Sequence, residues 1–159
     1  MSMTSGVASH DDATTGVITA SISLAVPPQR VFTALTSGAE VMRWWGSRET
    51  YVLKTWSAEL RVGGTWTTHG RRADGQTFDL TGTILAYDPP WRLVKTWRPC
   101  LDPQGTETTL TYQLSAIPGG TVLQVRHEGF TGRNDVAGAT TSGWTQVLGW
   151  LQAALTLPA

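Results

Sequence analysis

The sequence predicts a single α+β domain in which a mainly antiparallel sheet is covered by a long C-terminal helix. Three observations support this class. A strand pattern opens the ordered part of the chain, further strand patterns separated by turn residues follow it, and a helical pattern closes the chain. At 159 residues, the chain is long enough to bury a substantial core within one domain.

The first strand is expected from Val17 to Val26, where apolar residues alternate with small, mostly polar ones. Residues 1–16 are polar and rich in glycine, serine and threonine. We therefore expect them to be a disordered tail, and residues 17–159 to form the domain.

Short helices are expected after this strand. The first follows Pro28, because proline suits the first turn of a helix, and it ends before Gly38. The second covers residues 39–45 and ends at Gly46.

A series of strand patterns makes up the middle of the chain, and glycine, proline and aspartate mark the turns between them. Together with the first strand they predict a sheet of about seven strands, the first two patterns below being weak. The patterns cover residues 51–56, 59–62, 65–71, 78–86, 91–98, 106–116 and 121–128.

A long amphipathic helix is expected to end the chain, because apolar residues recur at helical spacing from Trp144 to Leu155 and Ser142 can cap it. The glycine-rich segment from Gly129 to Gly143 precedes it. Glycine content and polarity favour a mobile loop there, which we expect to gate a binding site.

Charge and composition limit the classes of partner. Lys plus Arg and Asp plus Glu both number 12, so no nucleic-acid partner is expected. A single cysteine, Cys100, cannot form an internal disulfide and suits a reducing compartment. We expect a cytoplasmic protein, because the sequence shows neither a secretory signal nor an apolar run as long as a membrane span.

No motif in the sequence indicates a cofactor or a metal. The three histidines and the cysteine lack the spacing of a zinc site. The paired glycines at 63–64 and 119–120 lack the continuation of a phosphate loop or a dinucleotide fingerprint. We therefore expect no cofactor and no metal.

Six short segments, in order, resemble the START-like (SRPBCC) superfamily, within its branch similar to the activator of the 90-kDa heat-shock-protein ATPase. They lie at Val26–Thr36, Met42–Gly46, Leu60–Trp66, Asp88–Trp97, His127–Phe130 and Gly143–Trp144. The resemblance implies the helix-grip fold, in which a curved sheet and the final helix enclose an apolar cavity.

The resemblance leaves several functions open, because the fold hosts carriers, polyketide aromatases or cyclases, toxin-sequestering proteins and chaperone cofactors. Our first hypothesis is a carrier, sensor or sequestering protein that binds a small hydrophobic or aromatic molecule. An aromatase or cyclase using the same cavity is the second, and a chaperone-regulating interaction protein is the third. The chain is too short to include the separate chaperone-binding domain of the eukaryotic activators. A homodimer stays open without support from particular residues.

Tryptophan is the strongest signal for a binding site, since the chain has eight tryptophans against three phenylalanines and three tyrosines. Indole rings suit an aromatic ligand, although most large apolar side chains only fill a core. Histidine, arginine or tyrosine would supply the polar contacts. The residues expected to contact a ligand are Trp44, Trp45, Trp66, His69, Trp97, Tyr112, His127 and Trp144.

Alternation divides the predicted strand at 91–98 into two faces. Leu93, Lys95 and Trp97 share one face, and Val94 and Thr96 share the other. Both faces mix apolar and polar residues, so the pattern does not show which one lines the cavity. His127 and Glu128 are adjacent on a strand and point to opposite sides, which argues against an acid–base pair.

Overall fold

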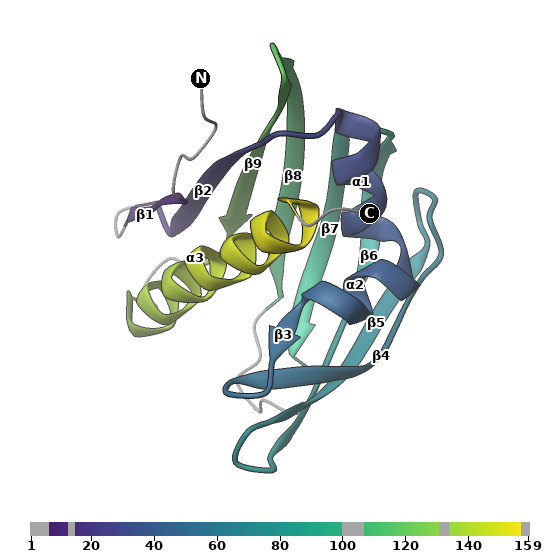
Figure 1. Cartoon of the computed structure of the whole chain (residues 1–159). Coiled ribbons are helices and arrows are strands. Elements are labelled where there is room, and N and C mark those ends of the chain that lie inside the picture. Colours follow the sequence, from purple (N-terminus) through teal and green to yellow (C-terminus); the bar gives the residue numbers. More distant parts are fainter. Residues whose placement is uncertain (1–6, 13–14, 100–106, 131–133, 157–159) are drawn as a thin grey trace.

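A curved antiparallel sheet surrounds one long helix in the computed structural model, which describes residues 7–12, 15–99, 107–130 and 134–156 (Figure 1). The strands are β1 (Ala8–Asp12), β2 (Val17–Leu24), β3 (Gly46–Ser47), β4 (Tyr51–Ala58), β5 (Thr65–Arg72), β6 (Thr77–Asp88), β7 (Arg92–Pro99), β8 (Thr108–Ile117) and β9 (Gly120–Glu128). The helices are α1 (Pro28–Thr36), α2 (Gly38–Trp44) and α3 (Asn134–Thr156).

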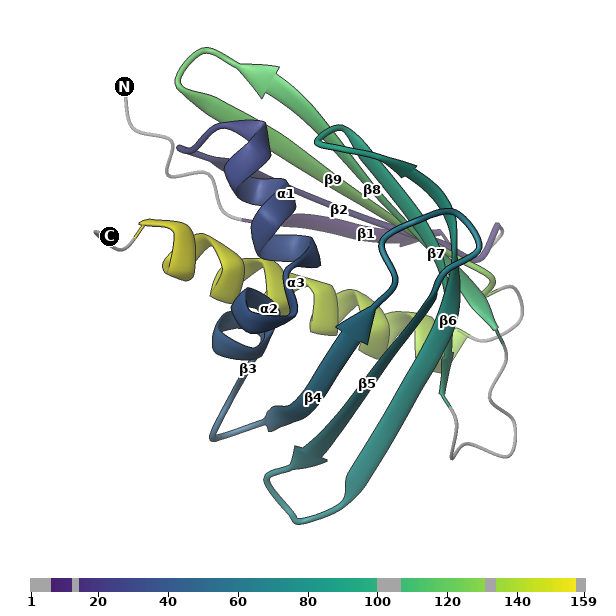
Figure 2. The same ribbon diagram turned by 90° about the vertical axis from the view of Figure 1, so that its right-hand side faces the viewer.

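The strand order across the sheet is β1-β2-β9-β8-β7-β6-β5-β4-β3, and every neighbouring pair is antiparallel. Strands β4 to β9 therefore form a meander, and β9 returns to pair with β2. Figure 2 shows α1, α2 and α3 on the concave side of the sheet. This α+β arrangement is the class that the sequence predicts, and it is consistent with the helix-grip fold that the resemblance implies.

The core forms where α3 packs on the concave face. Trp144, Val147, Leu148 and Leu151 are all buried along α3, at the helical spacing seen in the sequence. Burying an apolar side chain of this size contributes about 1.5–3 kcal/mol. The alternation in β2 directs Ile18 and its neighbours two residues apart into the same core.

The sheet has nine strands within the described residues, rather than about seven. Residues 59–62 are not a strand, because backbone bonds such as Gly64 N–H to Arg61 C=O close turns there. The short strand β3 was not predicted. Strand β1 lies in the predicted disordered tail, where its residues pair with β2 and Ser9 Oγ lies 2.6 Å from Thr145 Oγ1 on α3.

The predicted mobile loop from Gly129 to Gly143 is wrong over residues 134–143, which form the first turns of α3. Residues 131–133 lie outside the described part of the chain. A Cβ added at Gly138 or Gly143 would meet nothing within 4 Å, so neither glycine is required by packing. Glycine costs a helix about 1 kcal/mol per residue, and packing of α3 on the sheet overrides this preference. Within the described ranges, no helix has the length and apolarity that a membrane span requires.

Candidate ligand-binding site

A cavity of about 500 Å³ lies on the concave side, between strands β4 to β7 and the end of α2. The register explains its position. Trp66 and Thr68 lie two residues apart on β5, opposite Gly82 and Leu80 on β6, so the side chains of Trp66, Thr68 and Leu80 share the concave face. The aromatic residues that line it are Trp45, Tyr51, Trp56, Trp66, Phe78 and Trp97. This volume and lining are typical of pockets for small, mostly apolar ligands.

Trp66 forms the base of this cavity and is only 1% exposed. Its indole N–H donates a hydrogen bond of 2.7 Å to the carbonyl of Thr96 on β7. The ring reaches that carbonyl by crossing Gly82 on β6, where a Cβ would lie 2.5 Å from Trp66 Nε1. Thr96 also accepts from the backbone N–H of Thr83 through its hydroxyl at 2.8 Å. The pairing of β6 with β7 skips residues 82–83 and 96–97, and these hydrogen bonds bridge that gap and fix the indole.

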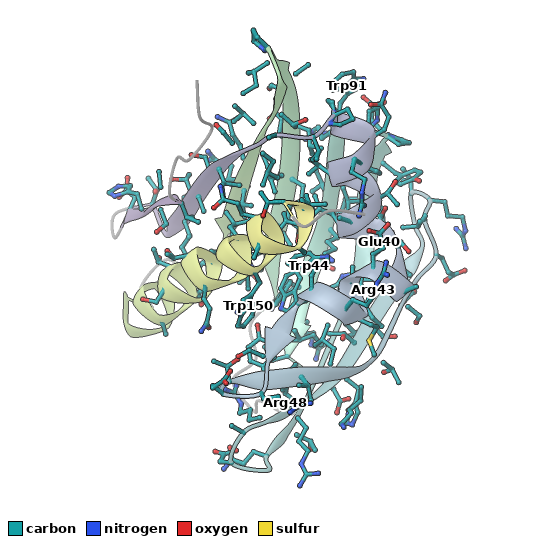
Figure 3. The ribbon with its side chains drawn as sticks, in the orientation of Figure 1. Glu40, Arg43, Trp44, Arg48, Trp91 and Trp150 are labelled. Carbon is teal, nitrogen blue, oxygen red and sulfur yellow. The ribbon has the colours of Figure 1, made fainter. Side chains whose placement is uncertain are left out.

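Trp45 closes the cavity from the end of α2. Its indole N–H donates to the hydroxyl of Tyr51 at 2.9 Å, and its ring lies 6.3 Å from Trp97. Burial is the main cause of a raised pKa for the Tyr51 hydroxyl. Trp150 on the side of α3 that faces β4 stands edge-on to Tyr51 at 5.7 Å (Figure 3). The rim of the cavity therefore depends on contacts from both α2 and α3.

Lys95 lies in the cavity lining with 4% of its surface exposed. It occupies the inward face of β7, opposite Ile84 on β6 and Leu110 on β8, which are both buried. Leu93, Lys95 and Trp97 therefore form the inward face of β7, which the sequence pattern alone did not identify.

The Lys95 ammonium is surrounded by ring faces. Its Nζ lies 3.8 Å from the centroid of Trp66, 5.5 Å from Trp56, and 6.0 Å from both Trp97 and Tyr112. Burial lowers the pKa of Lys95 to about 7, while the ring faces favour the charged form. In the described part of the chain, no carboxylate forms an ion pair with Lys95.

His127 holds α3 against the sheet rather than lining the cavity. The indole N–H of Trp144 donates to His127 Nδ1 at 3.1 Å, so the imidazole carries its proton on Nε2 and donates it to the Thr108 hydroxyl at 2.7 Å. That hydroxyl donates in turn to the carbonyl of Trp97 at 3.2 Å. Burial first, and the charge of Lys95 second, lower the pKa of His127 to about 3. The ring is therefore neutral at physiological pH.

Other predicted residues have structural partners of their own. The Trp44 indole N–H donates to the Ala34 carbonyl at 2.8 Å, which joins α2 to α1 (Figure 3). Tyr112 is 1% exposed, and burial raises the pKa of its hydroxyl. His69 Nδ1 lies 2.5 Å from the carboxylate of Asp79, and its side chain is 42% exposed. Asp79 borders the cavity, but this carboxylate is engaged by His69.

Of the residues predicted to contact a ligand, the cavity lining includes Trp45, Trp66 and Trp97. Ligand contact stays a prediction for all of them. The remaining five belong to the surrounding structure, and they are Trp44, His69, Tyr112, His127 and Trp144.

Lys95, Tyr51, Trp56 and Phe78 line the cavity and were absent from the predicted set. The sequence did contain an indication that Lys95 could line the cavity, because Lys95 shares a strand face with Leu93 and Trp97. No cluster of three or more potential metal-ligating side chains occurs among the residues that the structure describes.

Comparisons with known proteins agree with this architecture. Residues 25–156 match the model of the family described as Activator of Hsp90 ATPase homolog 1-like protein. A solved protein from Rhodobacter sphaeroides has 25% sequence identity and a TM-score of 0.82, covering 95% of this chain and 98% of that chain. Protein Ms6760 from Mycobacterium smegmatis has 18% identity and a TM-score of 0.83, covering 96% and 98% of the two chains.

The AHSA1 protein from Silicibacter pomeroyi has 24% identity and a TM-score of 0.75, covering 87% of this chain and 96% of that chain. No curated protein matches the chain. At these identities the solved structures show a shared fold, and the chemistry of the site has to be argued from this chain's own residues.

Proposed function

We propose a small-molecule-binding function for this chain, which belongs to the Activator of Hsp90 ATPase homolog 1-like family. The protein acts as a carrier, sensor or sequestering protein whose cavity holds a small hydrophobic or aromatic molecule. The observation that supports this most strongly is the cavity of about 500 Å³ with its aromatic lining. Burial of the ligand against these rings supplies affinity, and the few polar groups supply orientation.

The test is a titration of the full chain with naphthalene-based ligands, in which binding is measured by the quenching of tryptophan fluorescence. Trp56→Ala removes a ring from the cavity lining, and we expect it to weaken binding about tenfold or more. Trp91→Ala is the matched control, because Trp91 is 43% exposed and lies well away from Trp44 and Trp150 in Figure 3. Equal losses in the two variants, or no binding to the wild type, would contradict the proposal.

An enzyme of the aromatase or cyclase type is the second candidate, and Lys95 is the observation that favours it. An amine with a pKa of about 7 can transfer protons at neutral pH. His127 is a weaker candidate for this role, since both ring nitrogens are engaged in hydrogen bonds. Mass spectrometry of the bound molecule, extracted before and after incubation with the protein, separates the two functions. A carrier returns its ligand unchanged, whereas an enzyme returns a product.

A further inference from the structure

The charges bordering the cavity are unequal. Lys95 and Arg72 both line it, and the guanidinium carbon of Arg72 lies 5.7 Å above the ring of Phe78. Asp79 also borders it, but its carboxylate is engaged by His69. Among the described residues, no ion pair joins a carboxylate to either cation. The Lys95 ammonium and the Arg72 guanidinium can therefore pair with an anionic group of a ligand, whereas the Asp79 carboxylate lies beside His69.

The two cations occupy different depths. Lys95 is buried against Trp66 at the base, whereas Arg72 is exposed near the turn between β5 and β6. Phe78 lies beneath the Arg72 guanidinium and Trp56 lies beside the Lys95 ammonium, so both cations contact aromatic parts of the lining. A molecule with one anionic end and an apolar body would match this distribution.

We propose that the cavity binds apolar carboxylates, with the carboxylate group at the Lys95 ammonium and the apolar body against the surrounding rings. This inference rests on the proposed binding function and specifies its ligand class. A buried cation loses its hydration, and ring faces replace only part of what water supplied. A ligand carboxylate would give the ammonium a charge-assisted hydrogen bond inside a poorly hydrated site, where such bonds are strong.

The neighbouring groups make the proposal testable by pH. Facing Lys95 are Tyr112 on β8 and His127 on β9, with Tyr51 and Arg72 nearer the rim. Burial raises the pKa of both tyrosines, His127 has a pKa of about 3, and arginine stays charged. Asp79 and its partner His69 lie at the edge of the cavity. A pH-dependent preference is therefore assigned to Lys95 by its loss in the Lys95→Met variant.

The experiment compares 2-naphthoate and dodecanoate with the corresponding neutral alcohols, using the full chain and isothermal titration calorimetry. At pH 6 we expect the wild type to bind each carboxylate about tenfold to a hundredfold more tightly than its alcohol. This preference should decrease at pH 9. The Lys95→Met variant should lose the preference at both pH values and bind the alcohols within about twofold of the wild type.

The matched control is Lys54→Met, since Lys54 lies on β4 with an exposed side chain. It should retain the wild-type preference. If Lys95→Met keeps the preference, or if the wild type binds acids and alcohols equally, the carboxylate inference is wrong and the proposed binding function stands. If the wild type binds neither class, the proposed function fails together with the inference.

Discussion

Replacing Lys95 with methionine is expected to stabilise the protein by an amount that depends on pH. Burial lowers the pKa of this lysine from 10.5 to about 7. Each pH unit is worth about 1.4 kcal/mol, so holding the charged side chain in the folded state costs at most about 5 kcal/mol. The ring faces around the ammonium reduce this cost, so the figure is an upper limit. We therefore expect Lys95→Met to raise the free energy of unfolding by a few kcal/mol at pH 6, within that limit.

The sign of the pH dependence follows from proton binding. Between pH 7 and pH 10.5 the unfolded chain keeps the proton on Lys95, whereas the folded protein releases it. The wild type therefore gains stability as pH rises through this window, and methionine at this position removes that gain. The advantage of Lys95→Met should be greatest below pH 7 and should decrease steadily toward pH 10.

The assay is urea unfolding at intervals from pH 6 to pH 10, with the difference between variant and wild type taken at each pH. Other titrating groups cancel in this difference. Lys54→Met should give a small difference that does not change with pH, because Lys54 is exposed. A constant difference for Lys95→Met, or a loss of stability at pH 6, would refute the reasoning that burial depresses this pKa.

Two further predictions concern the framework of the site. The pKa of His127 is lowered to about 3, so between pH 6.5 and pH 3 the unfolded state binds a proton that the folded state does not. The free energy of unfolding should therefore decrease as the pH is lowered through this window. His127→Gln should flatten that part of the curve in urea unfolding, and an unchanged slope would contradict the assignment. Gly82→Ala should lower stability by about 2 kcal/mol, because a Cβ there collides with the Thr96 carbonyl. Gly138→Ala, which meets nothing within 4 Å, should instead gain about 1 kcal/mol, and thermal melts that show equal changes would refute both expectations.

The parts of the fold that the sequence predicts best are those where local pattern and burial agree. In β2 every second residue is buried, so the alternation alone identifies the strand and its inward face. The start of α3 was missed because Gly138 and Gly143 lower the helical propensity of a segment that packing on the sheet then stabilises. Strand β1 was missed for a similar reason, since its polar residues are ordered by pairing with β2.

The site was harder to predict than the fold because it depends on register between distant strands. Trp66 and Trp97 are large and apolar, and their strands indicate burial, yet only the pairing of β5 with β6 and of β6 with β7 brings both to one cavity. Trp144 and His127 were also predicted to contact a ligand. Their mutual hydrogen bond instead makes them part of the support for α3, and no sequence spacing reveals such a bond.

Lys95 connects the stability of the fold to the chemistry of the site. An apolar residue at its position would remove a desolvation cost, so the lysine is unfavourable for folding in the absence of a compensating anion. A ligand carboxylate would supply that compensation only in the folded state, and the energy recovered would appear as affinity for acids over neutral molecules. Because the same desolvation term underlies both effects, the pH window in which Lys95 weakens the fold is also the window in which its charge selects a ligand. Measurements of stability and of binding preference therefore report on one physical quantity, which is the free energy of keeping this ammonium charged beside Trp66.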